Sequence, residues 1–238
     1  MISISRNERI HSIEWKRGED VRATRVHAHA AWSLGIVCSG STTASFGRKR
    51  LRLERGDYLA VPPGTLHLCD PDTESGFSYS TLYVGAEYSG LFPTSFGCIF
   101  SGAVDTSAAD SLCERFIACR DARELAEILD RLATLLDSGL ARLLEPVATI
   151  RFDVSIDDGA PSRNDRYKEY RSSLRAYGAG SSSIHQTRRI ETAKALLRSG
   201  AAVVDAAMEC GYYDQSHFDK AFRLYTGLTP IAYRAQTY

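Results

Sequence analysis

The stretch GYYDQSHFDKAF, residues 211–222, places two phenylalanines four positions apart within a dense group of hydrogen-bonding side chains. Gly211 fits the left-handed position that follows the end of a helix, where a side chain would be strained. Asp214 fits an N-cap, because its carboxylate can accept from backbone N–H groups in the next turn. The stretch therefore predicts a turn and then a helix that runs to about residue 225.

The segment before this stretch, AVVDAAMEC (residues 202–210), predicts a short helix. Two helices joined by a turn that begins with glycine have the outline of a helix-turn-helix. Phe218 and Phe222 lie one turn apart and can pack on the small side chains Ala206 and Ala207. The remaining polar side chains can pair with base edges in the major groove of DNA. These candidate DNA contacts are Gln215, Ser216, His217, Lys220 and Arg223. The alternative is a solvated amphipathic helix that binds nothing.

The charge of the chain is unevenly distributed, although its formal total is zero. Residues 161–238 hold 12 Lys and Arg against 7 Asp and Glu, a net charge of +5, so the preceding residues have a net charge of −5. Long-range attraction to phosphate depends on local charge rather than on the total. The C-terminal part is therefore the part expected to meet nucleic acid.

The first hundred residues have a different pattern, in which short β-prone runs are broken by Gly, Pro and Asp. Residues 43–67 predict a hairpin that turns at Gly47, a second turn near Gly56 and a strand that ends at Pro62. Such frequent turns favour a β-barrel or sandwich. The predicted class is α+β with two domains.

A leucine-rich helix is predicted in DARELAEILDRLATLLDSGL, residues 121–140. Its apolar residues follow a helical period and form one stripe. The stripe either packs on the barrel of the same chain or pairs two subunits in the manner of a coiled coil, and its almost pure Leu and Ile composition favours the subunit contact. The candidate dimerisation residues are Leu125, Ile128, Leu129, Leu132, Leu135 and Leu136.

Residues 188–234 resemble the second half of the DNA-binding domain of the AraC/XylS family of bacterial transcription regulators. The resemblance combines the linker helix IETAKALL, the helix-turn-helix CGYYDQSHFDKAF and the closing TGLTPIAYR. In that family the start of the second recognition helix enters the major groove, which implies Gln215, Ser216, His217 and Lys220 as DNA contacts. Arg188 and Arg189 of the linker segment are added as candidates.

The family usually has a first helix-turn-helix as well, and this half is poorly matched. Glu169 and Ser173 stand where a Leu and a Phe are usual, and Gly159 and Pro161 fall where a helix should run. Proline inside a helix costs about 3 kcal/mol. The first motif is therefore expected to be degenerate.

The segment HAHAAWSLGIVCSG (residues 27–40) with GDYLAVPPGTLH (residues 56–67) resembles the cupin barrel that AraC-type regulators use to bind effectors. The second cupin motif is intact, but Ser33 and Leu34 stand where the first requires Glu. Three imidazoles can bind Zn, Fe or Ni, can hydrogen bond to a small molecule or can be structural. No metal is predicted, with His27, His29 and His67 as a weak candidate. The predicted ligand-binding residues are His27, His29, Trp32, Phe46, Tyr58, His67 and Tyr83.

The six cysteines form no C-x-x-C pair and are expected to be free thiols of a reducing compartment. No signal peptide or membrane span is evident, so a cytoplasmic protein is predicted. The predicted domains are 1–104 (effector sensing), 105–150 (helical linker and dimerisation) and 151–238 (DNA binding).

The predicted function is a homodimeric transcriptional regulator that binds double-stranded DNA and responds to a small-molecule effector, with no cofactor and no catalytic residues. Two alternatives stay open. One is a metal-dependent cupin enzyme, an isomerase or dioxygenase. The other is a regulator with impaired DNA binding of its own that acts through heterodimers.

Overall fold

The computed structural model describes residues 1–19, 25–72, 76–92, 106–137, 149–152, 163–177 and 179–236, with the backbone alone for 106–109, 133–137 and 163–166. Within these ranges eight strands come first, then a 3-10 helix η1 (Ala86–Leu91) and seven α-helices. None of these helices has the length and hydropathy needed to cross a membrane.

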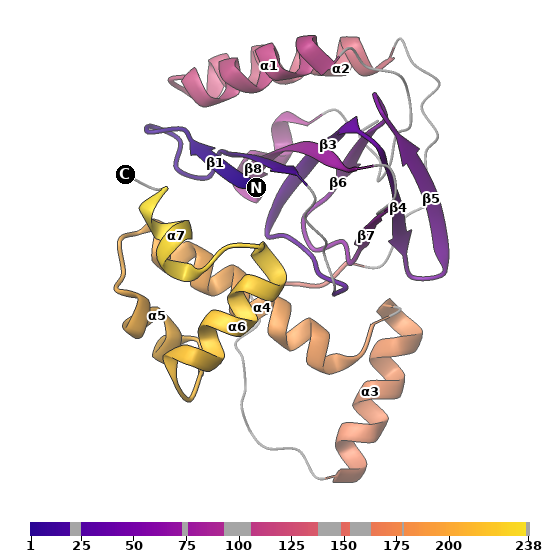
Figure 1. Ribbon diagram of the computed structural model, residues 1–238, viewed down its shortest axis with the longest axis vertical. Helices are drawn as coiled ribbons and strands as arrows, with labels where there is room; N and C mark the ends of the chain where they lie inside the picture. Colours follow the sequence, from indigo (N-terminus) through magenta and orange to yellow (C-terminus); the bar gives the residue numbers. More distant parts are fainter. Residues whose placement is uncertain are drawn as a thin grey trace.

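The strands form two antiparallel sheets (Figure 1), with the orders β1-β2-β8-β3-β6 and β5-β4-β7. Their bounds are β1 Ile2–Arg6, β2 Glu14–Glu19, β3 Ala31–Ser39, β4 Ser41–Phe46, β5 Lys49–Glu54, β6 Tyr58–Val61, β7 Leu68–Pro71 and β8 Ser78–Gly85. Side chains from both sheets share a buried cluster that includes Val37, Phe46 and Leu53. The sheets therefore enclose one core, as a cupin-like barrel requires.

The turns in this domain follow the glycines of the sequence. Gly47 has φ 58° and connects β4 to β5, whose last pair is Phe46 opposite Lys49. Gly56 has φ 89° and precedes β6, which ends at Val61 just before Pro62. Only glycine adopts these backbone angles without strain. The predicted hairpin and the second turn are confirmed.

Helices α1 (Thr106–Ala118) and α2 (Ala122–Asp137) lie across the larger sheet (Figure 1). Leu125, Ile128 and Leu129 of α2 are 0–3% exposed and belong to the same buried cluster as Trp15 and Val84 of the barrel. Apolar area removed from water stabilises the fold by about 25 cal/mol per Å². The barrel of the same chain therefore covers this part of the leucine stripe.

This packing is the first of the two alternatives, contact with the barrel, and not the subunit contact that the composition favours. Leu132 is half-buried against the same cluster, and the side chains of Leu135 and Leu136 lie outside the described residues. The stripe is apolar because it faces the barrel, so its pattern gives no reason to expect a second subunit there. A homodimer stays a prediction, and a contact through α2 would have to use the other face of the helix.

The C-terminal helices are α3 (Arg163–Tyr177), α4 (Ser181–Arg198), α5 (Val203–Glu209), α6 (Gln215–Thr226) and α7 (Pro230–Ala235). Phe218 and Phe222 of α6 are fully buried in one cluster with Ala206 and Ala207 of α5, as predicted. Gly211 has φ 71° after the end of α5. The helix-turn-helix predicted from this pattern is confirmed.

Helix α3 projects away from the rest of the molecule (Figure 1). Among its described side chains, residues 167–177, none is buried. Glu169 lies 3.1 Å from His185 of α4 as an exposed pair, and Ser173 is half-buried. Gly159 and Pro161 lie outside the described residues. The described part of the first motif thus has no core of its own, because polar residues replace the apolar ones that would form it.

The barrel and the C-terminal helices are joined by a buried group of charges. Glu14 of β2 lies 3.1 Å from Arg6 of β1 and 3.3 Å from Arg198 of α4. The hydroxyl of Tyr233, on α7, donates to the same carboxylate. The guanidinium of Arg6 lies over the Tyr233 ring, 4.3 Å from its centroid. This network holds α4 and α7 against the edge of the larger sheet.

Candidate functional site

The first turn of α6 faces outward. Asp214 caps the helix by accepting a 2.7 Å hydrogen bond from the backbone N–H of His217. All five predicted DNA contacts of α6 are exposed: Gln215, Ser216, His217, Lys220 and Arg223. The two phenylalanines anchor the opposite side of the helix in the core. The arrangement presents donors and acceptors for base edges on a rigid support.

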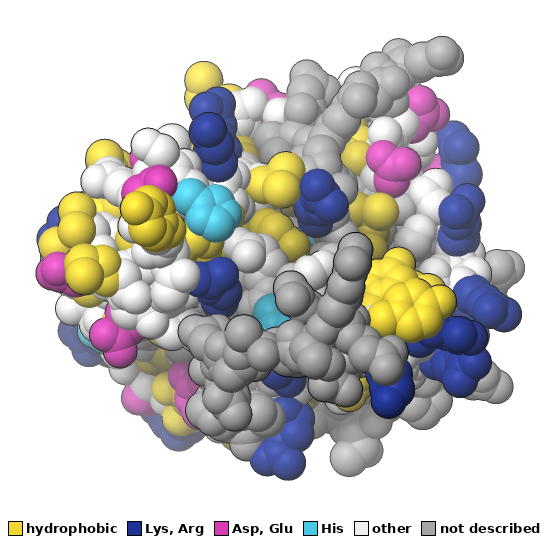
Figure 2. Space-filling view, turned by 90° about the horizontal axis from the view of Figure 1, so that it is seen from below, with side chains coloured by type: hydrophobic (Ala, Val, Ile, Leu, Met, Phe, Trp, Pro, Cys, Tyr) yellow, Lys and Arg dark blue, Asp and Glu magenta, His cyan; other side chains and the backbone are white. Residues whose placement is uncertain are grey.

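A groove beside this turn includes residues that the sequence pattern had not singled out. His217 and Lys220 line it together with Arg25 of the barrel domain and with Ser182 and Gln186 of α4. Figure 2 views the molecule from below, the side toward which α3 projects, and shows Lys and Arg side chains on the left, right and lower parts of this face. No local pattern could place Arg25 beside α6, because the two are far apart in the sequence.

The two arginines of the linker helix have partners within the chain. Arg188 donates from Nε to the carbonyl of Arg151 at 2.9 Å. Arg189 donates from Nε to the carbonyl of Cys210 at 2.5 Å and lies over the ring of Tyr212, 4.3 Å from its centroid. Their guanidinium groups thus help to hold α4 against its neighbours, and DNA contacts through them stay a prediction.

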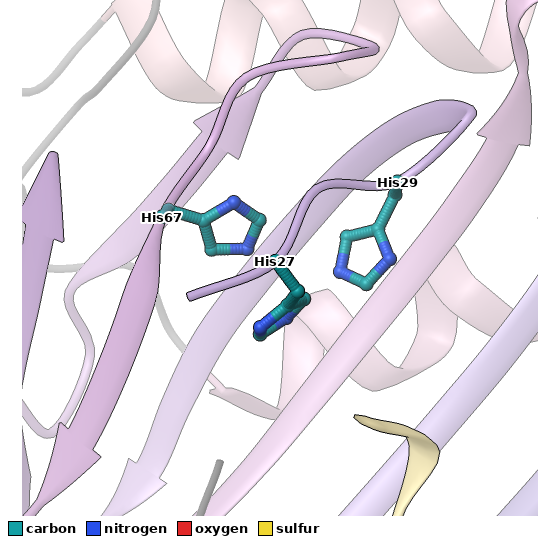
Figure 3. Close-up of side chains that lie close together, drawn as sticks. All are labelled: His27, His29 and His67. Atoms are coloured by element: carbon teal, nitrogen blue, oxygen red, sulfur yellow. The ribbon is translucent and has the colours of Figure 1, made fainter. Parts of the chain in front are cut away.

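The three barrel histidines come together, as their motifs predict (Figure 3). His27 and His67 exchange two backbone hydrogen bonds of 2.9 and 2.8 Å. The ring centroids lie 4.6 Å apart for His27 and His67, 4.9 Å for His27 and His29, and 5.3 Å for His29 and His67. One ring nitrogen from each lies within 4.8 Å of the others.

Burial keeps these imidazoles neutral. It lowers the pKa of His27 well below the ordinary 6.5, and the neighbouring imidazoles lower it further. Burial, together with His29, lowers the pKa of His67 to about 3. The pKa of His29 is also lowered by burial, although the carboxylate of Glu191 opposes this effect. At neutral pH the three rings can therefore accept a hydrogen bond or ligate a metal.

Glu191 of α4 reaches the histidines from the C-terminal domain. Its Oε1 lies 3.6 Å from Nδ1 of His29, and its Oε2 accepts a 3.1 Å hydrogen bond from the backbone N–H of Ala30. Lys194 donates to Oε1 at 2.9 Å. Burial would raise the pKa of Glu191, but Lys194 and His29 lower it more, and its pKa lies below the ordinary 4.5. No motif or spacing in the sequence indicates this contact.

A cavity of about 120 Å³ adjoins the histidines. Of the predicted ligand-binding residues, His27, His29, His67 and Tyr83 line it. The cavity wall also includes apolar barrel residues and residues 224–227, which are the end of α6 and its C-cap Gly227. Lys16 lines the cavity and donates from Nζ to the carbonyl of Thr226 at 2.9 Å. The cavity therefore lies between the barrel and the recognition helix.

Three predicted ligand-binding aromatics are not among the residues that line this cavity. Trp32 stacks on Phe92 with a centroid distance of 4.4 Å, and Tyr58 belongs to the same buried cluster. Phe46 is buried in the cluster between the sheets, with its ring centroid 6.0 Å from that of His67. Trp32 and Tyr58 thus lie on the face of the larger sheet that α1 and α2 cover, whereas Phe46 lies between the sheets, because successive strand residues point to opposite faces.

A barrel with a cavity, joined to a helix-turn-helix with an exposed recognition helix, defines a ligand-responsive transcription regulator. The chain belongs to the AraC family of these regulators. Residues 16–145 match the AraC-like ligand binding domain, and residues 166–236 match a helix-turn-helix domain. The barrel and the C-terminal helices thus have the roles that the sequence predicted: binding of a small-molecule effector and binding of DNA.

Solved structures of ToxT from Vibrio cholerae share this fold. The apo form of a ToxT variant matches with a TM-score of 0.56 at 10% identity, covering 98% of this chain and 100% of that one. ToxT bound to an unsaturated fatty acid matches with a TM-score of 0.55 at 10% identity, covering 99% and 95%. ToxT bound to a methylnaphthalenyl butenoic acid matches with a TM-score of 0.54 at 9% identity, covering 100% and 99%. No curated protein sequence matches the chain.

Proposed function

We propose that the effector of this regulator is a small molecule with an acidic group and an apolar body, which binds in the barrel cavity and acts on the recognition helix through Lys16. The observation that supports this proposal is the hydrogen bond from Lys16 Nζ to the carbonyl of Thr226. Lys16 is a cation in the cavity wall, and its present partner is the last residue of α6.

A carboxylate competes well for this lysine. The ammonium group of Lys16 now donates to a neutral carbonyl, whereas a carboxylate would add the attraction between two opposite charges in a partly buried site. An acidic effector would therefore withdraw Lys16 from the end of α6, while its apolar part would contact barrel side chains such as Leu59 and Phe77. Two of the ToxT structures named above contain acids with apolar bodies, and this shared fold supports the same chemical class here.

The proposed consequence is a shift between two arrangements of the domains. Lys16, Glu14 and Glu191 all join the barrel to the C-terminal helices. In the arrangement described above, these contacts hold the C-terminal helices against the barrel. A ligand that removes one of them lowers the stability of this arrangement relative to one in which α6 is held less tightly. Differential affinity for the two arrangements is the quantity that makes a ligand an effector.

The proposal includes a cytoplasmic homodimer that binds DNA through the exposed turn of α6, with no catalytic role for the barrel. Gln215, Ser216, His217, Lys220 and Arg223 are the proposed base and phosphate contacts, and Arg188 and Arg189 are the proposed contacts on α4. Because the described part of the first motif has no core of its own, the second motif is expected to supply most of the base contacts of each subunit.

The test begins with selection of bound duplexes from a random DNA library by the full-length chain. The selected duplex is then titrated by fluorescence anisotropy at several salt concentrations, where phosphate contacts give a steep negative slope of log K against log salt. A second titration adds carboxylic acids of different apolar bodies. An acid that changes duplex affinity supports the proposal, whereas a selection that yields no bound duplex would support the heterodimer alternative.

A further inference from the structure

We propose that His27, His29 and His67 form a binding site for one divalent transition-metal ion, in which Glu191 of the DNA-binding domain positions His29. His27 and His29 come from the segment before β3 and His67 from the residue before β7, and the three rings converge (Figure 3). One nitrogen of each lies within 4.8 Å of the others. Three imidazoles that converge in this way are a donor set for a metal ion.

The hydrogen bonds of two of these rings leave the same nitrogen available. Nδ1 of His27 lies 2.9 Å from the carbonyl of Arg25, and Nδ1 of His67 lies 2.8 Å from the carbonyl of Thr65. A carbonyl only accepts hydrogen bonds, so each Nδ1 is the protonated nitrogen of a neutral ring. Nε2 of both rings therefore keeps its lone pair for a metal, which is the pattern found around metal-ligating histidines.

The third ring, His29, has an acceptor beside it in the DNA-binding domain. Nδ1 of His29 is buried and has no hydrogen-bond partner, with Oε1 of Glu191 at 3.6 Å. A carboxylate also only accepts, and a displacement of several tenths of an ångström would bring the two atoms into hydrogen-bond distance. Each of the three Nδ1 atoms thus lies next to an acceptor. An arrangement in which a carboxylate accepts a hydrogen bond from a histidine that ligates the metal is common in zinc proteins.

The donor set also indicates the class of metal. Ser33 and Leu34 occupy the places where metal-dependent cupins have their glutamate, so the barrel motif itself supplies three neutral nitrogens. Imidazole nitrogens suit Zn²⁺, Co²⁺, Ni²⁺ and Fe²⁺. Bonds of about 2.0–2.1 Å require ligand nitrogens to lie roughly 3.3 Å apart. The rings must therefore draw together on binding, and two of them, His27 and His29, are only partly buried.

Metal binding at this site would connect the two domains. Drawing His29 into the site fixes its Nδ1–H toward Glu191, which already accepts from Lys194 and from the backbone of Ala30. The metal would therefore strengthen a contact between the barrel and α4. This inference does not depend on the acidic effector, because metal binding is measured on the chain without DNA or an organic ligand.

The experiment uses the full-length chain without an affinity tag, stripped with a chelator and titrated with Co²⁺, whose visible absorption reports its ligands. The expected result is saturation at one Co²⁺ per chain. His67→Ala should weaken Co²⁺ binding at least a hundredfold, whereas His185→Ala, a change at a half-buried histidine of α4, should leave it as in the wild type. Circular dichroism checks that each variant is folded, and His27→Gln replaces His67→Ala if the latter does not fold.

The role of Glu191 has its own readout. Loss of an outer-shell partner weakens metal affinity about 10–100-fold, so Glu191→Gln should retain a stoichiometry of one and show that loss of affinity. Absence of saturable Co²⁺ absorption in the wild type would overturn the site, as would wild-type affinity in both His67→Ala and His27→Gln. Unchanged affinity in Glu191→Gln would overturn the positioning role. The same preparation is also tested for binding to the selected duplex. If it binds the duplex but no Co²⁺, the metal site is wrong although the regulator function holds.

Discussion

The hydroxyl of Tyr233, on the last helix, donates a 2.5 Å hydrogen bond to Oε2 of Glu14, on the second strand, across 219 positions of the sequence. Arg6 and Arg198 lie 3.1 and 3.3 Å from the same oxygen. Burial raises the pKa of Glu14, but Lys194, Arg198 and Arg6 lower it more, to about 2. The barrel therefore holds the C-terminal helices through a carboxylate that is ionised at neutral pH.

Glu14→Gln should lower the free energy of unfolding by about 3–5 kcal/mol at pH 7, because it removes a buried charge that two arginines surround. The folded-state pKa of about 2 lies below the ordinary 4.5. The contribution of ionised Glu14 is therefore fully present above pH 4.5 and is lost as pH falls toward 2. Urea denaturation of both proteins between pH 2 and 7 measures it.

The matched control is Glu54→Gln, because the Glu54 side chain is 67% exposed and pairs with Arg52 at the surface. Such a pair contributes about 0–1 kcal/mol. If the difference in the free energy of unfolding between wild type and Glu14→Gln stayed the same from pH 7 to pH 2, ionisation of Glu14 would not be the source of the lost stability.

Lys16→Met should weaken binding of an acidic effector about 10–100-fold, because a hydrogen bond to a charged group contributes about 1.5–3 kcal/mol. Isothermal titration with the carboxylic acid found in the effector screen measures the affinity. Lys49→Met, a change of the same residue type at the exposed start of β5, serves as the control. Equal affinity in Lys16→Met and the control would show that the acid binds elsewhere.

Local patterns in the sequence were enough to predict the helix-turn-helix. Gly211 and Asp214 define the turn through backbone preferences, and Phe218 and Phe222 define the buried face through a spacing of one helical turn. The H-x-H motif likewise brought His27 and His29 to one site. Such features depend on a few neighbouring residues, so that the chemistry of a short segment determines them.

Contacts between the domains could not be predicted in this way. Glu191 of α4 meets Ala30 across 161 positions, and Lys16 meets Thr226 across 210. No periodicity relates such residues, since the folded barrel and helices create the contact. The leucine stripe of α2 shows the same limit: an apolar face must be covered, but its pattern does not say whether a barrel or a second subunit covers it.

Leu125→Ala should therefore act on stability and leave the subunit stoichiometry unchanged. Leu125 is fully buried against the barrel, and truncation of a buried leucine costs about 2–5 kcal/mol. Denaturant unfolding measures the loss, and sedimentation velocity measures the mass of the native protein. If the wild-type protein is a dimer and Leu125→Ala is a folded monomer of wild-type stability, Leu125 would instead lie in a subunit contact.

Gln215→Ala and Lys220→Ala should each weaken binding to the selected duplex by about 1–3 kcal/mol per lost base contact without unfolding the domain. Both side chains are exposed, and the buried Phe218 and Phe222 hold the helix independently of them. If Lys220 contacts phosphate, its replacement will weaken binding to all duplexes alike and make the salt slope shallower by about one. If Gln215 contacts a base, its replacement will relax the preference at a single position of the duplex. Lys49→Ala is the control for loss of a positive charge, and duplex affinity equal to that control in both variants would remove DNA contact from this face of α6.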